Sequence, residues 1–372
     1  MLGDVRINYI EKPYRVVNNN YRNIICLVAP FKDDSFVFKT YNSLKEAVNG
    51  EKTLDDNALG YHYLELLYEH FPDMPEIVLC NTTTTESGSL DYTLTNEKLA
   101  NILTELDEVG ISFVVIPEEL DLPKYVMYKA FYDEQRSKMN FFGLVHQVKP
   151  TLMVETDHEG NAIINETLSK LKALFDLFKT GGSWKTITTP LKFFNEELLT
   201  MEESVVYHAG LTATHEENIS ETHYILENIE GNITKCVYGD ELFNLINNTG
   251  AIAVNYRDKI HKVAQIYNSG TQTWNEQIEN TLDLKHERVK ALIGNEFRLR
   301  LLKLMGKDND KISYDDFESL ARDIRDTYKP SYISGLDWKV DKTGTAKISV
   351  PIETKQKNII TTIDVVGTQI IE

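Results

Sequence analysis

Four short runs of nearly uninterrupted apolar residues recur in the first 150 residues, and they constrain the fold more than any other feature. They read NIICLVAPF, EIVLCNT, ISFVVIP and FFGLVHQV, at residues 23–31, 76–82, 111–117 and 141–148. A strand with one solvated face alternates apolar and polar residues, whereas a strand buried on both faces is apolar throughout. The four runs therefore predict strands inside a sheet that is covered on both sides.

Helical patterns separate these strands. They occupy residues 43–50, 58–72, 95–110 and 126–140. Ser43 and Thr95 stand where helix N-caps belong, and Pro72 stands where the second helix must end. Strands that alternate strictly with helices predict an α/β layer with a mostly parallel sheet.

The second half of the chain centres on residues 247–306. An Asn-Asn-Thr-Gly turn leads into the apolar residues 251–254, and a second, polar strand is expected within residues 261–274. A long helix is then predicted from Trp274 to a stop at Gly306, because apolar residues recur there at helical spacing. The stripe consists of Ile278, Leu282, Val289, Ile293, Phe297, Leu301 and Leu304. A further helix is expected from a cap at Ser313 to Pro330.

Both ends of the chain carry alternating strand patterns that polar linkers separate from the rest. The alternating positions are Val5, Ile7 and Tyr9 near the N-terminus, and Ala346, Ile348, Val350, Ile359, Ile363 and Val365 near the C-terminus. Because a strand edge without a partner leaves backbone groups unsatisfied, we expect these arms to pair with other subunits. The alternative is that a terminal strand closes the sheet of its own chain.

Composition excludes several classes of partner and compartment. The net charge of −18 argues against broad binding to nucleic acid or to anionic membranes. No apolar run reaches the length of about 18 residues that a membrane-spanning helix needs, and the N-terminus does not resemble a signal peptide. The three cysteines, Cys26, Cys80 and Cys236, lie far apart in apolar contexts and are expected to be buried free thiols.

No motif for catalysis, metal binding or cofactor binding appears in the chain. Ser183 lacks the spacing of a nucleophile elbow, and His208, His215 and His223 do not match zinc-binding patterns. Phosphate-binding glycine motifs are also missing. We therefore predict no catalytic residues, no metal site and no cofactor. The alternative interpretation is a soluble α/β enzyme, such as a divergent hydrolase of the subtilisin-like type.

Several of these segments resemble the contractile tail sheath proteins, which form the contracting sleeve of phage tails and R-type bacteriocins. The glycine-led apolar strand at residues 250–254, the hairpin-like segment and a helix that begins Thr281-Leu282-Asp283 resemble the family's conserved block. Residues 111–119 resemble a family strand that ends in Pro-Glu, and Ala209, Gly210 and Ala213 match a family helix. The order of elements resembles the family along nearly the whole chain.

The resemblance implies an α/β fold with a subtilisin-like, mostly parallel sheet layer and helices, a C-terminal α+β domain and extended terminal β-strand arms. The implied boundaries are an arm at residues 1–22, the α/β domain at 23–240, the conserved C-terminal domain at 241–343 and a second arm at 344–372.

The resemblance also implies a structural subunit rather than an enzyme. Such subunits form stacked hexameric rings around an inner tail tube, and contraction drives the tube through a target cell envelope. The implied partners are further copies of the chain, the tube protein, and baseplate and tail terminator proteins, with no nucleic acid and no membrane insertion. Assembly would take place in the host cytoplasm, and the product would be a virion tail or a released contractile particle.

A basic segment interrupts this acidic chain between residues 285 and 307. It carries seven lysines and arginines against two glutamates. Because a block of charge opposite to the overall charge often marks a docking surface, and because the family's C-terminal domain faces the tube, we expect a tube-facing patch. Its residues would be Lys285, Arg288, Arg300 and Lys303. The alternative is that these side chains pair with acidic groups of their own fold.

Overall fold

A computed structural model describes the protein in two compact units. The first contains the described residues from Ile24 to Asp283, and the second contains those from Lys285 to Ile371. The described residues are 24–74, 76–86, 88–106, 111, 113–118, 120, 121, 123, 124, 126–128, 130, 131, 143–147, 184–187, 192, 193, 199–221, 224, 229–231, 253–258, 263–268, 270–275, 280–283, 285, 288, 289, 292–294, 296, 297, 300, 311–329, 331–336, 339–341, 347–354, 360–366 and 369–371.

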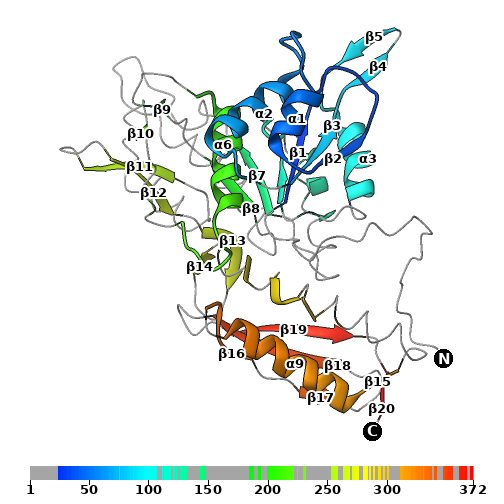
Figure 1. The fold of residues 1–372 in the computed structure, drawn as a ribbon, viewed down its shortest axis with the longest axis vertical. Helices are drawn as coiled ribbons and strands as arrows, with labels where there is room; N and C mark the ends of the chain where they lie inside the picture. The colour runs from blue at the N-terminus through cyan, green and yellow to red at the C-terminus, as the bar shows by residue number, and fades with distance from the viewer. Residues whose placement is uncertain are drawn as a thin grey trace. The chain divides into compact units, whose positions relative to one another are not determined.

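A six-stranded sheet forms the centre of the first unit (Figure 1). Its strands, in spatial order, are β2 (Phe38–Tyr41), β3 (Ile77–Asn81), β1 (Ile25–Ala29), β6 (Phe113–Val115), β7 (Gly143–Gln147) and β8 (Trp184–Ile187). All neighbours pair in parallel except β2 and β3. The mostly parallel sheet predicted from the four apolar runs is therefore confirmed.

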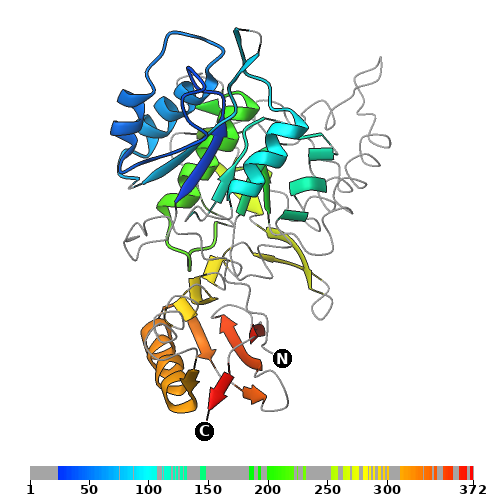
Figure 2. The same ribbon diagram turned by 90° about the vertical axis from the view of Figure 1, so that its right-hand side faces the viewer.

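Helices cover both faces of this sheet. They are α1 (Leu44–Gly50), α2 (Leu59–His70), α3 (Asn96–Leu106) and α6 (Met201–Thr214). Helices α1, α2 and α6 lie over one face and α3 over the other, as the two views show (Figure 2). The predicted caps are confirmed, since the hydroxyls of Ser43 and Thr95 accept bonds from the backbone N–H groups of Glu46 and Lys98.

Alternate side chains of the inner strand β1 face the helices on opposite sides of the sheet. Ile25, Leu27 and Ala29 belong to the core shared with α2 and α6, whereas Cys26 lies outside that core group. All five side chains of β1 are buried, which explains why the strand is apolar without alternation. Cys26 and Cys80 are buried free thiols, as expected.

Four two-stranded sheets also occur among the described residues of the first unit. Their strands are β4 (Thr84–Glu86), β5 (Ser89–Asp91), β9 (Lys192–Phe193), β10 (Ile229–Gly231), β11 (Ala253–Asp258), β12 (Val263–Asn268), β13 (Gly270–Asn275) and β14 (Asn280–Asp283). The antiparallel pair β11–β12 confirms the predicted strand and second strand within residues 247–274.

The predicted long helix begins later than expected. In the antiparallel pair β13–β14, Trp274 lies opposite Thr281, so the first part of the predicted helix is a hairpin. Helical structure appears among the described residues from Lys285 to Arg300. Threonine and tryptophan favour strands, and this preference with local pairing prevails over the helical spacing of Ile278 and Leu282.

The second unit combines a helix with an antiparallel sheet. Its elements are β15 (Lys311–Ser313), α9 (Tyr314–Tyr328), β16 (Ile333–Leu336), β17 (Lys339–Asp341), β18 (Lys347–Thr354), β19 (Ile360–Val366) and β20 (Gln369–Ile371). Strand β18 pairs with β16 and β17 along one edge and with β19 along the other. Phe317 of α9 is fully buried and stacks on Phe297, so the helix expected after Ser313 is confirmed with its apolar face inward.

The C-terminal strands therefore pair within their own chain. Ile348 lies opposite Val365 and Val350 lies opposite Ile363 in the β18–β19 pair. The boundary expected at residue 343 separates β17 from β18, although these strands pair with each other. These pairings fit the alternative of a self-closing sheet, and pairing of the same strands with other subunits stays a prediction. Val5, Ile7, Tyr9, Ala346 and Ile359 lie outside the described residues.

Candidate assembly surfaces

The carboxyl ends of β1 and β3 are where an α/β sheet usually binds a ligand, and here structural hydrogen bonds occupy them. The backbone N–H of Phe31 donates to Asn81 Oδ1 at 3.1 Å and to Thr83 Oγ1 at 3.0 Å. The first turn of α2 covers this position, because the N–H of Gly60 donates to the carbonyl of Pro30 at 2.8 Å. The described polar side chains here hold loops together rather than face a ligand.

Titratable groups gather nearby, between the ends of β6, α2 and α6. Partial burial raises the pKa of the Glu118 carboxyl, whose side chain is 47% exposed, whereas a hydrogen bond with His62 holds the pKa of Glu203 below its usual range. Glu203 also completes the capping box of α6 with Thr200. Burial raises the pKa of Tyr63. Within the part of the chain that the structure describes, no three His, Cys, Asp or Glu side chains could hold a metal ion.

One of the histidines considered from the sequence lies against a buried carboxylate. His208 of α6 lies with its Nε2 atom 3.1 Å from Oε2 of Glu221, and both side chains are almost completely buried. A buried charge needs such a partner. The contact with Glu221 therefore gives His208 a role in packing rather than in metal binding. His223 lies outside the described residues.

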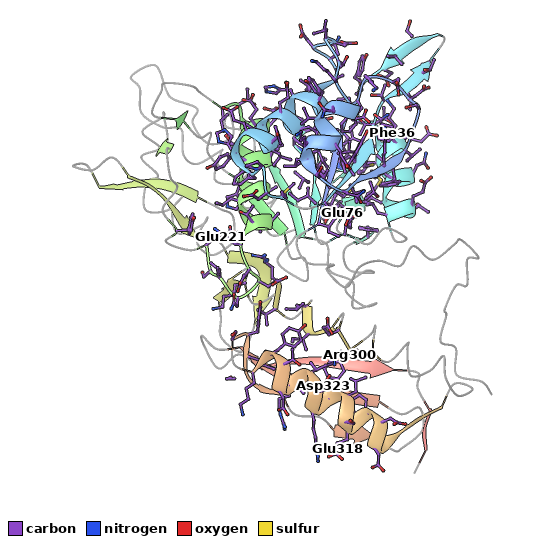
Figure 3. All side chains as sticks on the ribbon, in the orientation of Figure 1. Phe36, Glu76, Glu221, Arg300, Glu318 and Asp323 are labelled. Atoms are coloured by element: carbon purple, nitrogen blue, oxygen red, sulfur yellow. The ribbon has the colours of Figure 1, made fainter. Side chains whose placement is uncertain are left out.

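The expected tube-facing patch is not a free basic surface in this structure. Lys285 and Arg288 are only 6% and 3% exposed. Arg300 forms ion pairs with Glu296 and with Asp323 of α9 (Figure 3). Lys303 lies outside the described residues. The prediction is corrected for the first two residues because their neighbours on the same helix, Val289 and Ile293, are core residues that turn this face inward.

Two sheet edges differ in their readiness to accept another strand. In the second unit, β19 pairs with β18 along Ile360–Val366, and no described strand lies along its other edge. In the first unit, the edge strand β2 carries Lys39, and a lysine on an edge strand discourages pairing with another chain. Lys39 Nζ donates to Glu51 Oε1 at 2.8 Å. The open edge of β19 is therefore the better candidate for strand addition.

The buried carboxylate that anchors β2 was not predicted from the sequence. Glu51 is fully buried and accepts a second bond, of 2.5 Å, from the hydroxyl of Tyr41. Lys39 and Tyr41 stand two residues apart, on one face of a strand. This spacing was the available signal for a shared partner. No local pattern shows that Glu51, which directly follows Gly50, packs against these two side chains.

None of the described helices is long and apolar enough to cross a membrane. No protein-family profile matches the chain, and no curated protein does so either.

Solved structures do match the chain in fold. A sheath tail protein from Listeria innocua aligns with a TM-score of 0.65 and 10% identity, over 93% of this chain and 94% of its own. The contracted helical sheath of the anti-feeding prophage aligns with a TM-score of 0.62 and 11% identity, over 96% and 97% of the two chains. A chain of that prophage's six-fold symmetrised baseplate aligns with a TM-score of 0.59 and 13% identity, over 97% and 98%. The resemblance inferred from short segments is thus confirmed at the level of fold: this chain has the fold of tail sheath proteins from contractile systems.

Proposed function

We propose that this protein is a structural subunit of a contractile tail sheath. Copies form hexameric rings that stack around an inner tail tube, and contraction drives the tube through a target cell envelope. The observation that carries the proposal is a fold shared with a sheath tail protein and with a contracted helical sheath over more than nine-tenths of the chain. The hydrogen bonds that occupy the carboxyl ends of β1 and β3 also fit a structural role.

Strand exchange between subunits supplies the links in this proposal. The N-terminal arm with Val5, Ile7 and Tyr9 adds to the open edge of β19 in a neighbouring subunit, because an edge strand presents a row of unpaired backbone groups. Contraction is then a rigid-body rearrangement in which these strands act as hinges. If the assembled sleeve is metastable, a trigger at the baseplate releases it without ATP.

The proposed partners are further copies of the chain, the tube protein, and the baseplate and tail terminator proteins. Contact with the tube is assigned to the second unit. Since Lys285 and Arg288 are buried, the basic contribution to that contact must come from other residues of the segment, Lys303 among them. The product is a virion tail or a released particle, assembled in the cytoplasm of the host.

Negative-stain electron microscopy of the purified protein tests the proposal directly. A sheath subunit is expected to form tubes, rings or long polymers. A soluble α/β enzyme would appear as small monodisperse particles at every protein concentration, and that result would reject the proposal. The same grids, prepared with and without the tube protein, show whether the polymers assemble around a tube.

A further inference from the structure

The connections of the parallel sheet reverse direction between β1 and β6. The chain runs from β1 to β3 through α2, and it returns from β3 to β6, on the other side of β1, through α3. These two helices lie over opposite faces of the sheet (Figures 1 and 2). In α/β sheets, ligands bind outside the carboxyl ends of the strands at such a reversal. The side chains beside the carboxyl end of β6 are therefore candidates for a binding site.

A polar cluster occupies this position, formed by α2, the start of α6 and the segment that follows β6. Lys124 Nζ lies 3.8 Å from Glu118 Oε1 and 3.5 Å from Asp121 Oδ2. His62 of α2 contacts Glu203 of α6 through its Nε2 atom. We call these residues the switch-point cluster, which consists of His62, Tyr63, Glu118, Asp121, Lys124, Glu202 and Glu203. Its four carboxylates outnumber its one lysine and one histidine, so the cluster carries an excess of negative charge.

Tyr63 adds a polar group that the fold itself does not use. Its side chain is only 4% exposed and belongs to the core shared by α2 and α6. Within the part of the chain that the structure describes, its hydroxyl makes no hydrogen bond. A tyrosine hydroxyl on a buried ring usually has a partner. A ligand bound in the cluster would supply that partner.

The hydroxyl of Tyr63 lies within electrostatic reach of carboxylates from two elements. Burial, and then the charges of Glu202, Glu203 and Glu118, raise the pKa of Tyr63. The phenol therefore stays protonated at neutral pH and offers an oxygen that accepts a hydrogen bond. Carboxylates on α6 and after β6 and this hydroxyl thus form one set of acceptors.

The cluster is open to solvent on one side. The side chains of Glu118 and His62 are 47% and 53% exposed, whereas that of Glu203 is 15% exposed. A ligand reaches the more buried groups past the first two residues. Excess negative charge repels phosphates and carboxylates, and the described residues contain no group of three side chains that could hold a metal ion. The acceptors therefore suit an organic cation with several N–H donors.

We propose that the switch-point cluster binds a guanidinium or primary ammonium group. The carboxylates accept its N–H groups in charge-assisted hydrogen bonds, and the Tyr63 oxygen accepts one more. A guanidinium is the better match, because its fixed fork of donors reaches acceptors on two sides at once. Both a free polyamine or guanidine and the side chain of an arginine or lysine from another copy carry such a group.

Calorimetric titration of the full chain tests the proposal, at a protein concentration below that of polymerisation. The probe is propylguanidinium, and its control is propylurea, which has the same shape without the charge. We expect saturable binding of the probe and none of the control. A titration without saturable binding, or equal binding of the two compounds, would overturn the proposal.

Three variants locate the bound cation. Tyr63→Phe should weaken binding about fivefold, and Glu118→Gln about tenfold. The melting temperature of unliganded Tyr63→Phe should equal that of the wild type, since the hydroxyl makes no hydrogen bond in the described fold. Glu65→Gln removes the same charge from an exposed position of α2 and should leave the affinity intact. Unchanged affinity in the first two variants, or an equal loss in Glu65→Gln, would reject the cluster as the site.

Titration of the assembled polymer distinguishes the two sources of the cation. Polymers that take up no probe, although single subunits bind it, would show that a side chain of a neighbouring copy fills the site. Polymers that bind the probe as subunits do would indicate a free cation as the ligand. Either result retains the proposal. If the purified chain forms no polymer, the proposed sheath function fails, while binding by single subunits still decides this proposal.

Discussion

At the scale of single residues, the buried carboxylate of Glu51 shows most clearly how distant positions cooperate. It accepts bonds from Lys39 and Tyr41 and so ties the edge strand β2 to the end of α1. Glu51→Gln keeps the volume but removes the charge. We expect a loss of about 1–2 kcal/mol in the free energy of unfolding, a modest value because Lys39 is 42% exposed and regains water. Urea denaturation at pH 7 measures this loss.

The pH dependence of the Glu51 contacts follows from the raised pKa values of their two donors, Lys39 and Tyr41. The bond to Glu51 raises the pKa of Lys39, and burial together with Glu51 raises that of Tyr41. A raised pKa means that the folded state holds its proton more tightly, so this stabilisation is complete below the unfolded pKa and is lost as pH rises through the folded one. The difference between wild type and Glu51→Gln should shrink above about pH 10. A difference that stays constant up to pH 11.5 would show that the carboxylate acts only through its shape.

At the scale of elements, the contact between α2 and α6 depends on a glycine. A methyl group at Gly210 would overlap the ring of Phe71 and approach Leu67 Cδ2 to 2.8 Å. Alanine favours a helix over glycine by about 1 kcal/mol, but overpacking costs about 1–3 kcal/mol. We therefore expect Gly210→Ala to lower the melting temperature by several degrees, in a calorimetric measurement. Adding Phe71→Leu, which shortens the opposing side chain, should recover part of the loss. Purely additive losses in the double variant would place the strain elsewhere.

At the scale of the whole molecule, the two ends of the chain should behave differently on truncation. We expect removal of residues 1–12 to leave a folded protein with an unchanged urea midpoint that no longer polymerises, because the strand proposed for the open edge of β19 is gone. Removal of everything after residue 343 deletes β18, the strand that joins β16, β17 and β19, so this unit should lose its structure. Circular dichroism with electron microscopy separates the outcomes. Normal tubes from the first truncation would reject the arm as the link.

The elements that depend on local patterns were predictable from the order of amino acids. Continuous apolar runs specify strands with two buried faces, so β1, β3, β6 and β7 were predictable, and so were the caps at Ser43 and Thr95. The helix expected between Ser313 and Pro330 was likewise predictable, and Phe317 and Ile324 are fully buried on it. These features need only the geometry of a helix or strand and the presence of a core.

The partners of strand edges and charged side chains, in contrast, depend on how the folded chain packs. Spacing alone could not show that Trp274 lies in a hairpin, that β18 is enclosed by strands of its own chain, or that Lys285 and Arg288 are buried. The hairpin depends on which neighbouring segments pair, and the other two outcomes depend on how distant parts of the chain pack. A strand pattern or a local charge excess carries no information about either. A backbone edge or a cation is satisfied equally well by its own chain or by a neighbour, because the same hydrogen bonds and charges are available from either.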